Sequence, residues 1–240
     1  MWIAYPLYAS TYSGSNKYSG SWAPATGNGF GENNANGYQI NVWSASYNVL
    51  LGETTYVNNA SSTGQEFYAC GHQIPDADRQ YNQDMVQQTY YAINSTPQIQ
   101  NKFNGGIWQQ LENAVRTQAS TTDTLYVATG AAFDRADVSG TETVTWITPK
   151  GDPTKTCPVP NYYWKVLLKV TRNSDGKVTE ACSIGFWFVH QEYSNSSYGN
   201  YAISVNEIER RTGLDLFANL PDDIEETVEN NSNWQTFQNF

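Results

Sequence analysis

The sequence predicts an α+β fold in a single domain over residues 1–240, with a central antiparallel sheet and flanking helices. Stretches rich in β-branched and aromatic residues recur along the chain, and helical patterns occur among them without a regular strand–helix–strand alternation. Of the 240 residues, 39% are hydrophobic, 14% are aromatic and only 15% are charged. This balance excludes a disordered acidic chain, a coiled coil and a collagen-like repeat.

The strand-like stretches begin after residues 13–38, whose many Ser, Gly and Asn residues predict a long surface loop. Seven stretches fit a strand, namely residues 39–42, 66–69, 89–93, 124–129, 143–147, 162–170 and 182–189. The turn formers at 172–177 separate the last two stretches and predict a long hairpin.

Two amphipathic helices are well marked. The first follows Gly105-Gly106 and places apolar residues on one stripe, at Ile107, Trp108, Leu111 and Val115. The second begins near Ser204, where Glu207 completes a capping-box pattern, and ends near Gly213. An acidic helix over residues 222–230 follows Pro221.

The charge distribution is uneven. The net charge is −10, and residues 200–240 hold eight acidic residues against two arginines. An acidic chain argues against a protein that coats nucleic acid, because coating requires Lys and Arg, but it is compatible with an enzyme that has a small basic cleft. The most apolar stretches, 164–170 and 184–189, are shorter than the roughly 18–20 residues of a membrane span. We therefore expect no membrane span, and the start at Met1 leaves open a removed signal or lipid anchor.

The chain contains two histidines. His190 follows the apolar stretch 185–189 without neighbours that suggest chemistry, so we interpret it as a structural residue at a strand end. His72 lies in Gly71-His72-Gln73-Ile74-Pro75, at a turn after a predicted strand, and Asp76, Asp78 and Arg79 follow it.

Polar residues downstream of His72 follow a helical spacing. Glu112 and Arg116 share one face of the first helix, and Asn104 lies at its N-terminal end, two turns before Glu112. The opposite stripe is apolar, so this row can face a cleft. The alternative is that Glu112 and Arg116 form an exposed ion pair worth about 0.3–0.5 kcal/mol.

Together these segments resemble the DNA/RNA non-specific endonuclease family, whose active site is a ββα-metal (His-Me finger) unit. The family pattern is Asp-Arg-Gly-His with a later proline, then Asn-x-x-Pro-Gln, then Asn-x-Gly-x-Trp-x-x-Leu-Glu at the start of a helix. Gly71-His72 with Pro75, Asn94-Ser95-Thr96-Pro97-Gln98, and residues 104–112 occur in that order. Similar segments extend the resemblance over nearly the whole chain, at residues 2–5, 125–130, 158–165 and 207–217.

The resemblance implies a Mg²⁺-dependent nuclease, with Mn²⁺ as a substitute, that cuts DNA and RNA with little sequence preference and leaves 5′-phosphate ends. His72 would be the general base, since an ordinary histidine pKa of ~6.5 suits that role. Asn104 would bind the metal directly, and Glu112 would orient water around the ion. Arg116 would contact the scissile phosphate, and Asn94 would brace the site.

One departure from the family pattern precedes His72. Ala69-Cys70 stands where the family has Asp-Arg. That arginine helps to hold the phosphate, so its loss predicts reduced activity, and Arg79 is a candidate replacement for substrate binding. Two other functions stay open, a weakened or inactive relative that binds nucleic acid or a protein partner, and a glycan-binding module suggested by 17 Tyr and 8 Trp.

The three cysteines leave several interpretations open. Cys70 is a buried strand residue, a disulfide partner or a reactive thiol, and no four-ligand spacing around it indicates zinc. Because members of the family are generally exported, the resemblance implies a Cys157–Cys182 disulfide and a secreted, periplasmic or cell-surface location. A homodimer is a further expectation.

Overall fold

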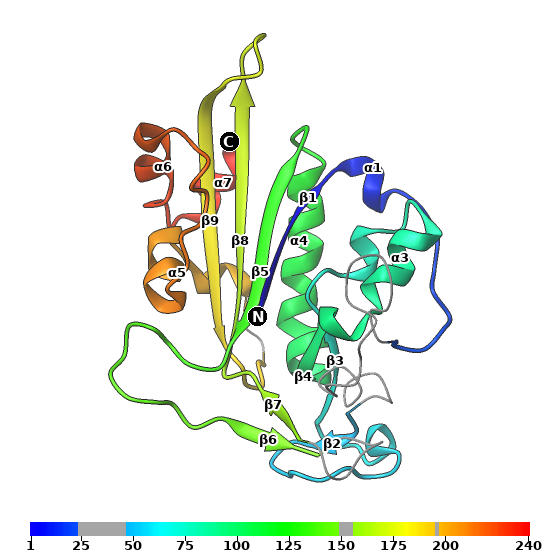
Figure 1. The fold of residues 1–240 in the computed structure, drawn as a ribbon. Coiled ribbons are helices and arrows are strands. Elements are labelled where there is room, and N and C mark those ends of the chain that lie inside the picture. Colours follow the sequence, from blue (N-terminus) through cyan, green and yellow to red (C-terminus); the bar gives the residue numbers. More distant parts are fainter. Residues whose placement is uncertain (24–46, 149–155, 195–196) are drawn as a thin grey trace, which may run out of the picture.

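The computed structural model describes residues 1–23, 47–148, 156–194 and 197–240, and these residues form an α+β fold with antiparallel sheets (Figure 1). The larger sheet has the strand order β1-β5-β8-β9-β10, the smaller sheet has the order β2-β3-β4, and β6 pairs with β7. The strands are β1 (Trp2–Leu7), β2 (Val49–Leu50), β3 (Phe67–His72), β4 (Ser95–Ile99), β5 (Leu125–Ala132), β6 (Thr145–Ile147), β7 (Cys157–Val159), β8 (Tyr162–Arg172), β9 (Val178–Val189) and β10 (Ala202–Ile203).

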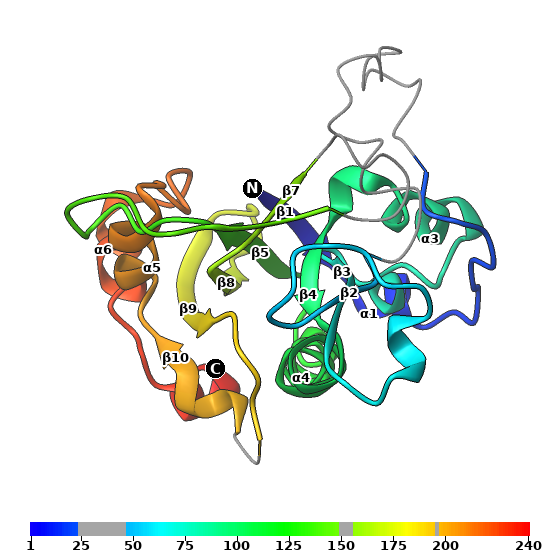
Figure 2. The ribbon, with the colours of Figure 1, turned by 90° about the horizontal axis from the view of Figure 1, so that it is seen from below.

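Helices cover both faces of the larger sheet, with α4 on one side and α5 and α6 on the other (Figures 1 and 2). The helices are α1 (Ala9–Tyr12), α3 (Gln83–Thr89), α4 (Gln109–Ala119), α5 (Val205–Thr212), α6 (Asp222–Val228) and α7 (Trp234–Asn239). Among the described residues, we find no helix with the length and apolar character needed to cross a membrane.

Strand β8 shows how the sheet divides two apolar layers. Alternate side chains of a strand point to opposite faces. Tyr163 and Leu167 accordingly belong to the core on the α4 side, whereas Trp164 and Val166 pack with Val205 of α5. Because both faces are covered, the strand is an almost continuous apolar run rather than an alternating one.

The predicted hairpin and the α5 helix are confirmed. Asn173 closes the β8–β9 turn by accepting hydrogen bonds from the backbone N–H groups of Asp175 (3.1 Å) and Lys177 (2.9 Å). Ser204 caps α5 by accepting from the Glu207 N–H at 3.2 Å, and Gly213 ends it with a left-handed φ of 70°.

The predicted strand at residues 89–93 is wrong, because helix α3 continues to Thr89 and a helical turn occupies Ala92–Asn94. Asn82 starts α3 by accepting from the N–H groups of Asp84 and Met85. The N–H groups of Tyr90, Tyr91 and Asn94 then close turns onto carbonyl oxygens three residues earlier. The strand is β4 instead, which accommodates Pro97 because it lies at the edge of its sheet. The stretch at 39–42, and residues 24–38 of the predicted loop, lie outside the described residues.

The expected Cys157–Cys182 disulfide is also wrong, since both residues are thiols. Cys157 lies on β7 of the small β6–β7 pair, whereas Cys182 lies on β9 opposite Lys169 of β8. The Nδ2 of Asn231 approaches the Cys182 sulfur at 3.8 Å, so this thiol faces the C-terminal segment.

His190 has the structural role that we inferred for it. Its Nε2 accepts from the Ile99 N–H at 3.0 Å and its Nδ1 lies 2.9 Å from the Pro160 carbonyl oxygen, so Nδ1 carries the proton and donates. The ring thereby connects the end of β4 to the larger sheet. Burial lowers the pKa of His190 to about 4, which keeps the ring neutral.

We predict that His190→Gln weakens the pH dependence of stability below pH 6.5. In the unfolded chain the histidine binds its proton near pH 6.5, whereas in the folded protein it does so only near pH 4. The contribution of His190 to the free energy of unfolding is therefore fully present above pH 6.5 and falls by up to about 3 kcal/mol as the pH is lowered towards 4. Urea unfolding at pH 7 and pH 5 measures this. The same pH dependence in both proteins would contradict the prediction.

Candidate active site

Two strands and a helix build the site. β3 pairs with β4 in an antiparallel register that sets His72 opposite Ser95, and the chain continues through the wide helical segment Gln100–Trp108 into α4. Gly106 departs from helical geometry in that segment (φ −108°, ψ −114°). A Cβ there would lie 3.0 Å from the Asn101 carbonyl oxygen, so the bend favours glycine.

A pocket of about 170 Å³ lies between these elements. Three of the residues predicted from the sequence, His72, Asn104 and Glu112, line it together. The remaining lining residues are Pro75, Asp76, Gln100, Gly105 and Gln109. The sequence therefore located residues that the fold brings to one cavity from separate elements.

His72 is enclosed by aromatic rings. Its ring centroid lies 4.6 Å from that of Trp22 and 4.8 Å from that of Tyr90. Burial lowers the pKa of His72 to about 4, although the nearby Asp76 acts in the opposite direction. The imidazole is therefore neutral at pH 7 and able to accept a proton. Its Nε2 is buried and has no hydrogen-bond partner among the described residues, which favours a partner supplied by solvent or substrate.

Asn104 presents a carboxamide oxygen to the pocket. Its Nδ2 donates to Gln100 Oε1 at 3.2 Å, and this contact leaves Oδ1 as an acceptor. Asp76 and Glu112 add carboxylate oxygens to the same lining. Oxygen donors of this kind fit Mg²⁺, which keeps several of its waters. Among the described residues, no group of three or more His, Cys, Asp and Glu side chains is arranged to hold a metal ion.

Glu112 is not a member of an exposed ion pair. Arg116 instead donates from Nη1 to Asp78 Oδ1 at 2.8 Å, and the Tyr5 hydroxyl donates to Asp78 Oδ2 at 2.8 Å. Burial raises the pKa of Glu112 to about 7, opposed by the positive charges of Lys165 and Arg116. Asp78 and Asp76 raise it further.

The two predicted phosphate-binding arginines lie outside the pocket. Arg116 lines a neighbouring cavity of about 440 Å³, next to Thr117 and Ser120 of the same helix region. Arg79 packs over the Tyr5 ring at 4.9 Å and donates to the Pro6 carbonyl oxygen at 3.3 Å. No Lys or Arg is among the described residues that line the His72 pocket.

Asn94 holds the backbone that follows His72. Its Oδ1 accepts from the Ile74 N–H at 2.9 Å, and its Nδ2 donates to the carbonyl oxygens of Ile74 (2.9 Å) and Thr89 (2.8 Å). Its own carbonyl oxygen accepts from the Gln73 N–H at 2.8 Å. Asn94 does not line the pocket, so its contacts indicate a positioning residue rather than a reacting group.

The Gly-His and Pro-Gln segments fit together directly. A Cβ on Gly71 would lie 2.0 Å from the side chain of Gln98, which is fully buried against it.

Burial and the neighbouring Cys157 raise the pKa of the Cys70 thiol to about 12, so Cys70 is not a reactive thiolate. Cys70 is also absent from the pocket lining.

Sequence reasoning missed four residues near His72 and Glu112. Asp76, Gln100 and Gln109 line the pocket, and a search for polar residues flanking the His72 and Asn104 motifs would have found them. Lys165 is fully buried and affects the pKa of Glu112 from β8. The signal for Lys165 was a charged residue within an otherwise apolar strand.

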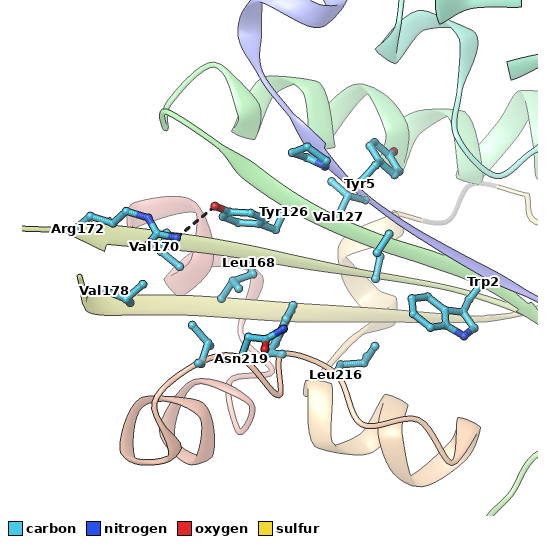
Figure 3. Close-up of a pocket in the computed structure, with 15 residues that line it drawn as sticks. Trp2, Tyr5, Tyr126, Val127, Leu168, Val170, Arg172, Val178, Leu216 and Asn219 are labelled. Carbon is cyan, nitrogen blue, oxygen red and sulfur yellow. Dashed lines mark hydrogen bonds between the residues drawn. The ribbon is translucent and has the colours of Figure 1, made fainter. Parts of the chain in front are cut away.

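A larger groove of about 460 Å³ lies elsewhere on the fold (Figure 3). Strand residues such as Trp2, Tyr126 and Leu168 form one wall, and Leu216 and Asn219 of the α5–α6 connection form the other. Among the described residues lining the groove, Arg172 is the charged one, and it donates to the Tyr126 hydroxyl at 3.3 Å. Its described lining contains no His, Asp, Glu or Lys, so the smaller polar pocket is the candidate active site.

Comparison with known proteins shows the family of the chain. A family model described as DNA/RNA non-specific endonuclease matches residues 1–223. The chain belongs to this family. The alignment with a nuclease of Serratia marcescens has 29% identity over 162 residues and covers 66% of this chain and 54% of that nuclease. The alignment with mitochondrial Nuclease 1 of Schizosaccharomyces pombe has 27% identity over 157 residues and covers 64% of this chain and 47% of that nuclease. The matches thus span about half the length of these relatives.

A solved structure extends the likeness to the fold of nearly the whole chain. A chain in the crystal structure of the EndoG/EndoGI complex superposes with a TM-score of 0.59 at 18% identity. The match covers 93% of this chain and 80% of the other. At this identity the likeness concerns the fold alone, and it agrees with the α+β architecture of antiparallel sheets.

We predict that Asn94→Ala lowers the free energy of unfolding by about 2–4 kcal/mol, because it leaves the N–H and C=O groups of Ile74 and the Thr89 carbonyl unpaired. Asn113→Ala is the control, since that exposed side chain accepts from Arg116 and has no other hydrogen-bond partner within residues 1–23, 47–148, 156–194 and 197–240. Urea unfolding compares the two variants. Equal, small losses in both would contradict the bracing role of Asn94.

Proposed function

We propose that residues 1–240 act as one domain of a metal-dependent endonuclease that hydrolyses phosphodiester bonds of DNA and RNA with little sequence preference and leaves 5′-phosphate ends. The observation that carries this proposal is the convergence of His72, Asn104 and Glu112 on one pocket, within a ββα unit of a chain that belongs to the family.

His72 is the general base of the proposed reaction. Its neutral imidazole takes a proton from a water molecule as the water oxygen forms a bond to phosphorus. The bond between phosphorus and the 3′-oxygen breaks, and that oxygen acquires a proton from solvent. The products are a 5′-phosphate and a 3′-hydroxyl.

Asn104 and Glu112 supply the metal-binding part of the proposal. Asn104 would hold Mg²⁺ through Oδ1, and the Glu112 carboxylate would face the ion's hydration shell. The bound ion would contribute positive charge at the phosphate and the departing oxygen. Mn²⁺ accepts the same oxygen ligands and is the proposed substitute.

Several finer features belong to the proposal. Arg116 would reach the phosphate of a bound strand only by exchanging its contact with Asp78, and Arg79 would likewise have to leave the Tyr5 ring. A secreted, periplasmic or cell-surface location is proposed on the family resemblance. Relatives named mitochondrial nucleases occur in two yeasts, so fractionation of cells that produce the protein is the test of location.

A homodimer is also part of the proposal, and analytical sedimentation of the purified protein tests it.

We predict that the protein degrades both plasmid DNA and RNA when Mg²⁺ is added and that EDTA stops the reaction. His72→Ala should lower kcat by 10²–10⁴-fold, the usual contribution of a general base. The control variant Asn101→Ala is changed at an exposed residue three positions before Asn104, and it should cleave at the rate of the original protein. Absence of cleavage by the unaltered protein across Mg²⁺, Mn²⁺ and pH 6–9 would reject the proposed function.

A second candidate function, a weakened relative that binds nucleic acid or a protein partner, is favoured by two observations. The described lining of the His72 pocket contains no Lys or Arg, and Cys70 replaces the family arginine.

We predict that Cys70→Arg raises the cleavage rate at least tenfold, because it restores a charge-assisted phosphate contact. The control is Cys157→Ser, which alters the neighbouring thiol without adding charge. Initial rates on plasmid DNA measure the effect. A rate unchanged by the arginine would show that position 70 does not limit catalysis.

A further inference from the structure

Two carboxylates follow His72 in the chain, and they have different partners. Asp78 is 1% exposed and forms an ion pair with Arg116, whose Nη1 lies 2.8 Å from Asp78 Oδ1. The Tyr5 hydroxyl donates to the other carboxylate oxygen of Asp78 at 2.8 Å. A buried carboxylate requires an opposite charge and hydrogen bonds, and Asp78 has both within the protein.

Asp76 has no such compensating charge. Tyr90 donates from its hydroxyl to Asp76 Oδ2 at 3.0 Å. A phenol is a neutral donor, so this hydrogen bond orients the carboxylate without neutralising it. No Lys or Arg in the described part of the chain forms an ion pair with Asp76. Arg79, three residues later, instead donates to the Pro6 carbonyl oxygen.

The backbone around Asp76 does not depend on its side chain. Asp76 begins the short helical turn Asp76–Asp78, which closes through backbone hydrogen bonds. The preceding residue, Pro75, supplies no side-chain cap to this turn. Asp76 nevertheless lines the His72 pocket, so its uncompensated carboxylate points to a role in that cavity.

Tyr90 is held in place by rings on the histidine side of the site. Its ring packs edge-on against the His72 ring, with the centroids 4.8 Å apart. Its centroid also lies 4.9 Å from that of Tyr18 and 5.1 Å from that of Trp22. The Tyr90 carbonyl oxygen accepts from the Ala23 N–H at 3.1 Å. These contacts fix the ring beside the proposed general base, and its hydroxyl then sets the position of the carboxylate.

A divalent cation in this pocket would meet Asp76 through water. Among the described residues, no group of three or more His, Cys, Asp and Glu side chains is arranged to bind an ion directly. Mg²⁺ takes few protein ligands and keeps most of its waters, which donate hydrogen bonds to nearby carboxylates. Asp76 enters the pocket from the segment after β3 and Glu112 enters it from α4, so the two carboxylates reach the cavity from different elements.

We propose that Tyr90 is a positioning residue whose hydroxyl holds the Asp76 carboxylate towards the candidate metal pocket, where that carboxylate accepts hydrogen bonds from the water shell of a bound divalent cation. This inference rests on the proposed function, because it adds a residue pair to the same metal site. Without the hydroxyl, Asp76 loses the hydrogen bond that orients it, and the cation binds less tightly.

Calorimetric titration of the full chain with Mn²⁺ tests the proposal. Tyr90→Phe keeps the ring and removes only the hydroxyl, and it should weaken Mn²⁺ binding at least fivefold. Asp76→Ala should weaken it at least tenfold. The matched control is Tyr5→Phe, which removes the equivalent hydrogen bond to Asp78 and should lower Tm but change Mn²⁺ binding less than twofold. Unchanged binding in Tyr90→Phe, equal losses in both phenylalanine variants, or no Mn²⁺ binding by the original protein would overturn the proposal.

A double-mutant cycle separates positioning from packing. If Tyr90 acts through Asp76, Tyr90→Phe should have no further effect on Mn²⁺ binding in an Asp76→Ala background. Losses that add in the double variant would show that Tyr90 acts by another route and would overturn the proposal.

Plasmid cleavage gives a second measurement. Tyr90→Phe should need at least fivefold more Mg²⁺ for its half-maximal rate, and added Mg²⁺ should restore cleavage. A loss of rate that Mg²⁺ does not restore would contradict a role in cation binding. If Mn²⁺ binding follows the expected pattern but the protein cuts no nucleic acid, the Tyr90–Asp76 assignment holds and the proposed function fails. If the protein cuts and Mn²⁺ binding is unchanged in Tyr90→Phe, the function holds and the assignment fails.

Discussion

The antiparallel pairing of β3 with β4 is the interaction on which the candidate site depends. It sets Gly71 opposite Thr96 and His72 opposite Ser95, and it buries Gln98 where Gly71 has no side chain. A slip of one residue would turn His72 to the other face of the sheet, away from the helix. Because the chain passes from β4 into α4 through one irregular segment, the same pairing also carries Asn104 and Glu112 to the histidine.

The charges of the site are compatible with the proposed action of an acidic protein on a polyanion. Asp76 and Glu112 face the pocket and its described lining holds no Lys or Arg, so the cavity attracts a cation before it attracts a phosphate. The ion would then supply the positive charge that nucleic acid requires. The acidic α6 lies across the larger sheet from α4, so its carboxylates do not crowd the pocket (Figures 1 and 2). A net charge of −10 is therefore compatible with the proposed nuclease.

Local sequence signals predicted the elements whose causes are local. The β8–β9 hairpin and the capped α5 helix agree with the structure, and so do the residues that converge on the pocket from the Gly-His and Asn104 motifs. The predicted strand at 89–93 is wrong because α3 continues to Thr89 and a separate helical turn occupies Ala92–Asn94. The sequence did not show that Arg116 and Arg79 contact Asp78 and Tyr5, because these partners come from other elements. Lys165 was missed because only the packing of α4 on β8 brings it near Glu112.

The most direct test of the central claim is a crystal of the protein soaked in Mn²⁺, with anomalous scattering used to locate the ion. The proposed site requires one peak in the His72 pocket, about 2.1–2.2 Å from the Asn104 carboxamide oxygen and surrounded largely by water. A peak bound elsewhere, or a fully occupied pocket without Asn104 among the ligands, would contradict the assignment of this cavity as the metal centre of a nuclease.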